Sequence, residues 1–206
     1  MPAAPEDEFS AVVDALTSGG VAVVPTDTLF GIAVSPLHAP SPQVLYEIKG
    51  RPSDKPVAWL VSNQRDLETY GEGVADYARC FADAFWPGAL TLIVNASNRV
   101  PQAYQSQAGT IGLRMPDDAL VRVIADEVGC PLAVTSANLS GQSDPRRFVD
   151  IDPAIFARVD AAIDDEQDKS GVGSTVVDCT GSSYRILREG SITRADLDAA
   201  LASCAK

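Results

Sequence analysis

Seven short apolar runs constrain the fold of this chain more than any other feature of its sequence. Each run is a few residues long and is bounded by Pro, Gly or small polar residues, a pattern that predicts strands rather than helices, with the first of them buried. The runs cover residues 21–25, 57–61, 89–94, 110–115, 131–135, 174–178 and 184–188.

Between these runs, apolar residues recur at helical spacing. Helices are predicted over residues 9–18, 41–50, 75–86, 117–129 and 193–202. In the second of these, Ser41 is the expected N-cap, Pro42 the first helical residue and Gly50 the stop signal. Strands thus alternate with helices, and the last two strands predict a hairpin. The expected fold is one α/β (α+β) domain around a twisted mixed sheet.

Size and charge limit the classes of function. The chain has 206 residues, of which 46% are hydrophobic, enough for one domain with a real core. The net charge of −12 argues against a broad nucleic-acid-binding face, so an anionic ligand needs a local cluster of basic residues. No apolar stretch approaches the length of a membrane span, and the acidic start "MPAAPEDEFS" does not resemble a signal peptide. A cytoplasmic protein without membrane contact is expected.

The cysteines give no sign of a metal centre. Cys80, Cys130, Cys179 and Cys204 are scattered, no C-x-x-C pair exists, and His38 is the only histidine. The sequence therefore predicts neither a zinc site nor a disulfide framework, but idle thiols in a reducing compartment. With one imidazole and no G-x-S-x-G elbow, a Ser-His-Asp hydrolase is not expected either.

Polar residues gather where the predicted strands end. In "VVPTDTLFG", the first strand stops at Pro25 and hands over to Thr26, Asp27 and Thr28. Other strands end or begin at Arg114, Ser136, Asn138, Ser174 and Arg188. Ligand crevices favour such edges, because short polar side chains and backbone amides converge there.

Three loops have open interpretations. "KGRPSDKP" (49–56) is the densest cationic stretch and fits either a polyphosphate cradle or a solvated basic loop. "TSANLSG" (135–141) fits either a ligand-gripping loop or a hydrogen-bonded turn. The acidic residues of 164–168 do not follow the calcium-loop pattern, so a solvated, mobile loop with room for a lid role is expected there.

Taken together, seven motifs resemble the YrdC/Sua5 family of threonylcarbamoyl-AMP synthases, which act in the N6-threonylcarbamoyl modification of tRNA adenosine. They lie in the family's order between Val21 and Ile192, as "PTDTLFG", "KGRPSDKP", "PGALTLIV", "TIGLRMPD", "TSANLSG", "STVVD" and "ILREGSI". The resemblance implies a twisted mixed sheet curved around a large concave cavity. It also implies the short form of the family, a single domain over residues 1–206 without the extra C-terminal domain.

The resemblance further implies a reaction and its participants. L-threonine, bicarbonate or CO2, and ATP would give threonylcarbamoyl-AMP and pyrophosphate, which makes the enzyme a nucleotidyltransferase. Mg²⁺ would accompany ATP, with no protein metal site expected, and downstream transferase proteins would carry the product to tRNA. Such chemistry explains the missing nucleophile, because the reactants supply the attacking atoms and the protein needs only to align them.

Residue roles are carried over from the same motifs. Threonine is expected to contact Thr28, Arg114 through its carboxylate, Ser174, and Val134 through its backbone, while Leu29 and Phe30 close an apolar pocket around the methyl group. ATP is expected to contact Lys49, Arg51, Lys55, Thr110, Ser136, Asn138, Asp144 and Arg188.

Two positions depart from the family pattern. Leu60 stands where some members have a threonine-contacting histidine, and Phe30 replaces a frequent tyrosine. The K-x-R and S-x-N signatures remain, which favours the synthase over the sister YciO branch. A YciO-like role, or a binder of double-stranded RNA or tRNA without synthase activity, stays as the alternative. The hydrogenase-maturation relatives are much longer and carry cysteine motifs absent here.

Overall fold

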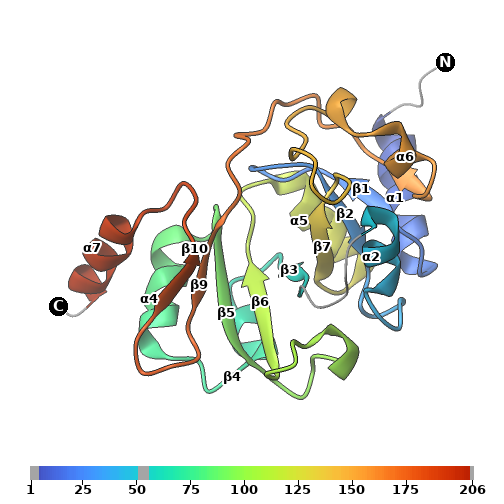
Figure 1. Ribbon diagram of the computed structural model, residues 1–206. Coiled ribbons are helices and arrows are strands. Elements are labelled where there is room, and N and C mark those ends of the chain that lie inside the picture. Colours follow the sequence, from blue (N-terminus) through green and yellow to red (C-terminus); the bar gives the residue numbers. More distant parts are fainter. Residues whose placement is uncertain (1–4, 51–55, 205–206) are drawn as a thin grey trace.

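A single mixed sheet organises the chain (Figure 1). The computed structural model describes residues 5–50 and 56–204, and in that part ten strands follow the order β10-β9-β5-β6-β3-β7-β2-β1-β8, with β4 beside β5. The pairs β1–β8, β3–β6 and β5–β9 are parallel and the others antiparallel. The predicted mixed α/β sheet is therefore confirmed, as is the terminal hairpin of β9 and β10.

The strands are β1 (Ala22–Val24), β2 (Gly31–Val34), β3 (Ala58–Leu60), β4 (Gly71–Glu72), β5 (Leu90–Ala96), β6 (Thr110–Arg114), β7 (Leu132–Ser136), β8 (Ala161–Ala162), β9 (Thr175–Asp178) and β10 (Arg185–Arg188). The helices are α1 (Pro5–Thr17), α2 (Gln43–Lys49), α3 (Asp66–Tyr70), α4 (Asp76–Phe85), α5 (Ala119–Val128), α6 (Pro153–Phe156) and α7 (Arg194–Cys204), with 3₁₀ turns at Gln102–Tyr104 and Phe148–Asp150. In the described residues, no helix is long and apolar enough to cross a bilayer.

Alternation along the strands divides the interior into two cores. Val23, Ile32 and Trp59 point into a large cluster that also holds residues of α2, α4 and α7. Their sequence neighbours Ala22 and Leu60 point the other way, into a cluster with α1 and α5. Successive strand residues face opposite sides of a sheet, so the uninterrupted apolar runs of β1 and β2, buried at every position, fit a part of the sheet that is covered on both faces.

Helix ends follow the expected chemistry closely. Gly50 ends α2 with a left-handed backbone, φ 61°, which glycine adopts without strain. Asp118 caps α5 through its side chain, and Gly129 ends it at φ 78°. The prediction for the start of α2 was one residue early, because the helix begins at Gln43, whose amide lies 3.4 Å from the Ser41 hydroxyl.

The strand β2 was absent from the prediction. It begins directly after Phe30 and pairs antiparallel with β1, Ala22 opposite Ala33. The two strands are joined by the short polar stretch after β1, which the sequence alone presents as a ligand loop rather than a hairpin connection.

The prediction for two cysteines was wrong. Cys80 of α4 and Cys204 of α7 form a disulfide with their Cα atoms 6.2 Å apart. They are separated by 124 residues, so only the packing of α4 against α7 brings them together. Cys130 and Cys179 are free thiols as expected. Burial raises the pKa of Cys179 to about 12, which keeps it protonated and unreactive.

Candidate active site

The strand ends enclose one cavity of about 380 Å³. Its wall comes from the β1–β2 turn, from β3, β5, β6 and β7, and from the residues around β9 and β10. It includes eight of the twelve predicted site residues, namely Thr28, Thr110, Arg114, Val134, Ser136, Asp144, Ser174 and Arg188. The strand-end prediction therefore located a real concavity.

The β1–β2 turn is organised by Thr26. Its hydroxyl accepts the amide of Leu29 at 3.1 Å and donates to the Leu29 carbonyl at 2.7 Å. It also accepts the amide of Thr28 at 3.2 Å. The Thr26 hydroxyl thus shapes the turn, and Thr26 lines the cavity together with Thr28, Leu29 and Phe30, the last three as predicted. Asp27 is not among the lining residues; it lies behind them.

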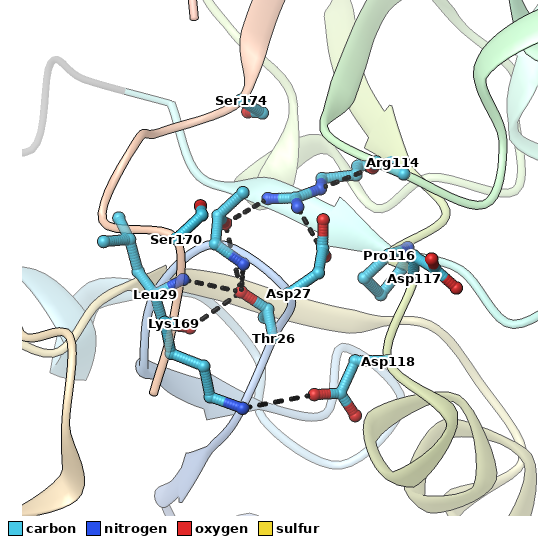
Figure 2. A network of polar contacts seen from close by, with 12 residues as sticks. Thr26, Asp27, Leu29, Arg114, Pro116, Asp117, Asp118, Lys169, Ser170 and Ser174 are labelled. Carbon is cyan, nitrogen blue, oxygen red and sulfur yellow. Dashed lines mark hydrogen bonds and ion pairs between the residues drawn. The ribbon is translucent and has the colours of Figure 1, made fainter. Parts of the chain in front are cut away.

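Arg114 is the buried cation of the cavity, with 6% of its surface exposed. Its Nε donates to the Gly88 carbonyl at 3.0 Å, Nη1 to the Thr28 hydroxyl at 2.8 Å, and Nη2 to Asp27 at 2.6 Å (Figure 2). Burial lowers the pKa of this guanidinium from its usual value, and the Asp27 carboxylate opposes that shift. Each terminal nitrogen carries two N–H groups and uses one in these contacts, so within the described residues one N–H on each is left over for a ligand oxygen.

Ser174 is held between two strands. Its hydroxyl lies 2.8 Å from that of Thr91 and accepts Arg188 Nη2 at 3.2 Å, while Arg188 Nε donates to the Ser174 carbonyl at 3.1 Å. Thr91 is buried and also lines the cavity. Thr91 was not predicted as a site residue, although a lone threonine inside the apolar run "ALTLIV" was a usable signal.

Lys49 behaves differently from its prediction as a cavity residue. It is 4% exposed, and its ammonium donates to the carbonyl of Ser136 at 2.5 Å, the carbonyl of Asn138 at 2.7 Å and the Asn138 side-chain oxygen at 2.6 Å. Neither Lys49 nor Asn138 lines the cavity, but Ser136 does. Lys49 therefore holds the loop after β7 from behind. Arg51 and Lys55 lie outside the described residues.

The cavity offers little to a metal ion by itself. Asp144 is the one carboxylate among its described lining residues. No group of three or more His, Cys, Asp or Glu that could hold a metal occurs in the part of the chain that the structure describes.

The segment 164–173 corrects another expectation. Glu166 and Asp168 are exposed, as a solvated loop requires. Asp165, however, is paired with Lys169, whose side chain is buried. The acidic residues were interpreted as a charge run, but one of them belongs to an internal ion pair.

Comparison with known proteins identifies the family. A family model for Sua5/YciO/YrdC, described as "Telomere recombination", matches residues 14–190. This chain belongs to the Sua5/YciO/YrdC family. The threonylcarbamoyl-AMP synthase of Bacillus subtilis is 33% identical over 190 residues, 90% of this chain and 54% of that protein. The chain thus spans about half the length of that relative.

Two solved structures of the family share the fold. The crystal structure of Sua5 from Pyrococcus abyssi, complexed with L-threonine, matches with a TM-score of 0.89 and 26% identity over 98% of this chain and 59% of that one. The crystal structure of YciO from Escherichia coli matches with a TM-score of 0.80 over 91% of each chain, and its 24% identity supports the shared fold alone.

Both departures from the family pattern lie in the cavity. Leu60 and Phe30 are lining residues, and both are buried. Their side chains present apolar surface where a histidine or a tyrosine hydroxyl would present polar atoms. The wall at this point therefore depends on shape rather than on hydrogen bonding.

Proposed function

We propose that this chain is a threonylcarbamoyl-AMP synthase, which joins L-threonine, bicarbonate or CO2, and ATP with release of pyrophosphate. One observation carries the proposal. A buried arginine with two N–H groups to offer lies in the same cavity as the hydroxyls and Arg188 of the predicted nucleotide side. The names of the family relatives point to the same reaction.

The amino acid would bind at Arg114. Its carboxylate would accept the remaining N–H groups of Nη1 and Nη2, and the hydroxyls of Thr28 and Ser174 would contact its polar atoms. Leu29 and Phe30 would enclose the side-chain methyl group. An apolar wall discriminates by about 1–3 kcal/mol per methylene. We therefore expect strong rejection of leucine and weaker rejection of serine.

ATP would occupy the other part of the cavity. Thr110, Ser136 and Arg188 line it and offer donors to the nucleotide. Lys49 and Asn138 would act through Ser136, because they hold its loop from behind. Arg51 and Lys55 remain predicted phosphate contacts.

The reaction needs no protein nucleophile. The threonine amine combines with bicarbonate to give a carbamate and water, or with CO2 to give a carbamate and a proton. A carbamate oxygen then attacks the α-phosphorus of ATP, and the bond to pyrophosphate breaks. Holding the carboxylate at Arg114 aligns the carbamate with ATP. Alignment of this kind can lower the activation barrier by several kcal/mol.

The residues fit a magnesium ion that arrives with ATP rather than one caged by protein. Mg²⁺ is typically bound through substrate phosphates and one or two carboxylates, and Asp144 is the lining carboxylate that could contribute. When bound, the ion would neutralise phosphate charge.

Pyrophosphate release by the purified protein tests this function. Release from ATP that requires both L-threonine and bicarbonate supports the synthase, and transfer of the product to tRNA by threonylcarbamoyl-transferase proteins would extend it. Release without threonine, or none at all although ATP and threonine bind, contradicts it. Binding of RNA with a steep salt dependence, and of neither substrate, would favour the RNA-binding alternative.

A further inference from the structure

A buried lysine lies outside the machinery proposed above. Lys169 is 4% exposed, yet its ammonium is paired with Asp165 and lies 3.6 Å from Asp118 Oδ2. Both carboxylates are nearly buried as well, with 9% and 7% of their side-chain surfaces exposed. Three charges are thus enclosed together, at a place where no substrate group has been assigned.

This cluster joins two parts of the chain. Asp165 and Lys169 belong to the segment 164–173, and Asp118 is the residue that caps α5, accepting the Val121 amide at 3.1 Å. The ammonium of Lys169 therefore ties the segment to the first turn of that helix (Figure 2).

The same segment is bonded to the β1–β2 turn by its backbone. The amide of Gly171 donates to the Thr28 carbonyl at 3.0 Å, and that of Ser170 faces the Asp27 carbonyl at 3.4 Å. Gly171 has φ 75°, and a Cβ there would lie 2.5 Å from the Arg146 side chain, so the approach is close. Lys169, Asp118 and Asp165 form a tether for this segment, and the tether thus lies directly beside Asp27 and Thr28, which hold Arg114.

Lys169 also touches the cavity wall from behind. Its ammonium lies 5.0 Å from the centre of the Phe30 ring, within the range of a cation–π interaction, and Phe30 lines the cavity. At the other end of the segment, Gly173 and Ser174 line the cavity too. Lys169 therefore contacts the apolar wall of the cavity through Phe30. Its segment also leads directly into Ser174, a proposed polar contact of the amino acid.

Stability alone does not account for such a cluster. Burying charges costs several kcal/mol per ion, and apolar residues in place of a buried ion pair often leave a protein equally stable. What the charges add is a fixed geometry, since Lys169 must meet two carboxylates on different elements at once.

We propose that Lys169 is a positioning residue for the amino-acid end of the cavity. Through Asp118 and Asp165 it fixes segment 164–173, and through that segment and the Phe30 ring it fixes Thr28, Phe30 and Ser174. The part concerning the amino acid rests on the proposed function. The tether itself does not.

The tether can be measured without substrate. Hydrogen exchange in Lys169→Met and in the charge-neutral pair Lys169→Met with Asp165→Asn should be at least tenfold faster at Ser170 and Gly171, while β9 and β10 keep wild-type protection. The double variant leaves fewer unpaired buried charges and serves where the single one folds poorly. Asp168→Asn, the same change at an exposed position of the segment, is the matched control and should exchange like wild type.

The positioning role needs a second readout. In the Lys169 variants, KM for L-threonine should rise about tenfold while KM for ATP stays within about twofold, and the preference for threonine over serine should fall. Lys169→Arg, which keeps the charge, should recover part of the wild-type KM for threonine and part of the preference for threonine over serine. Unchanged exchange at Ser170 and Gly171 would overturn the tether, and faster exchange with unchanged threonine kinetics would overturn the positioning role. If wild-type protein itself releases no pyrophosphate, the proposed function fails, and the exchange result still decides the tether.

Discussion

Two buried cations serve the two ends of this cavity in different ways. Arg114 and Lys49 are equally hidden, at 6% and 4% exposure. Arg114 lies on the cavity wall, held by three protein acceptors with N–H groups left for a ligand. Lys49 lies behind the wall, and its ammonium meets oxygens of Ser136 and Asn138. Burial of a cation therefore does not by itself mark a binding residue. The better sign is an N–H group that the contacts within the protein leave over for a ligand.

The difference follows from the shape of the two groups. A guanidinium has five N–H donors in a plane, so it can be fixed on one side and still bind on the other. An ammonium has three donors around a point, and Lys49 donates to oxygens of Ser136, at the end of β7, and of Asn138, in the loop that follows. We infer that Arg114 binds substrate and that Lys49 shapes the loop that does.

Arg114→Ala should have the largest effect on activity. It removes the two charge-assisted hydrogen bonds that we propose to the threonine carboxylate, each worth about 1.5–3 kcal/mol. KM for L-threonine should therefore rise by more than about 100-fold, with KM for ATP nearly unchanged, as measured by pyrophosphate release at varied concentrations of each substrate.

Arg185→Ala is the control for that measurement, because Arg185 is an exposed arginine that pairs with Asp178 far from Arg114 in the sequence. It should leave both constants at wild-type values. Should Arg114→Ala raise KM for ATP instead, the assignment of threonine and ATP to the two ends of the cavity would have to be exchanged.

Lys49→Met should act on stability and on ATP together. It leaves the oxygens of Ser136 and Asn138 without their ammonium donor, at a cost of about 1–3 kcal/mol per buried group. With about 2–4 °C per kcal/mol for a domain of this size, even the low end of that cost, about 3 kcal/mol for the three oxygens, should lower the melting temperature by roughly 6–12 °C. KM for ATP should rise and KM for threonine should not.

Ser136→Ala separates the two parts of that effect. Ser136 lines the cavity, so loss of its hydroxyl should weaken ATP binding, and because its one O–H donates to Asn138 Oδ1, at 2.6 Å, the melting temperature should fall less than in Lys49→Met. A Lys49→Met protein that melts like wild type but no longer binds ATP would mean that Lys49 contacts phosphate directly.

Asp27→Asn should have a moderate effect on the arginine end. The amide keeps the shape of the side chain and removes the charge that pairs with Arg114 at 2.6 Å. Because Asp27 lies behind the guanidinium rather than in the cavity, we expect KM for threonine to rise about tenfold, less than for Arg114→Ala. An effect as large as that of Arg114→Ala would show that Asp27 touches the substrate itself.

The sequence predicted which strand-end residues lie at the cavity better than it predicted which residues line the cavity and which support it from behind. Arg114, Ser174 and Ser136 were found because each follows or precedes an apolar run, and strand ends converge in a sheet. Lys49 was assigned to the cavity, because a pattern of charges cannot tell which donors the fold already uses. Asp165 and Lys169 were hidden for the same reason, since their partner Asp118 lies on another element.

The disulfide was beyond sequence reasoning for a related cause. Cys80 and Cys204 are 124 residues apart, and neither stands in a recognisable spacing. Their proximity depends on the docking of α7 against α4, to which the buried Leu197 also contributes. Long-range pairs of this kind appear only once the packing of elements is known.

Cys204→Ser should have the smallest effect on activity. It tests whether substrate binding at the two cavity ends depends only on residues near the cavity. The disulfide joins α7 to α4, and neither cysteine lines the cavity. A cross-link closing a long loop stabilises a protein by about 2–4 kcal/mol, so the melting temperature should fall by several degrees. Both KM values should stay within about twofold. Wild-type protein treated with a reductant should match the variant, and a variant that melts like untreated wild type would contradict the bond. A large rise in either KM would mean that α7 acts on the cavity through Thr175, whose hydroxyl donates to the Ile192 carbonyl at 2.6 Å just before α7 begins.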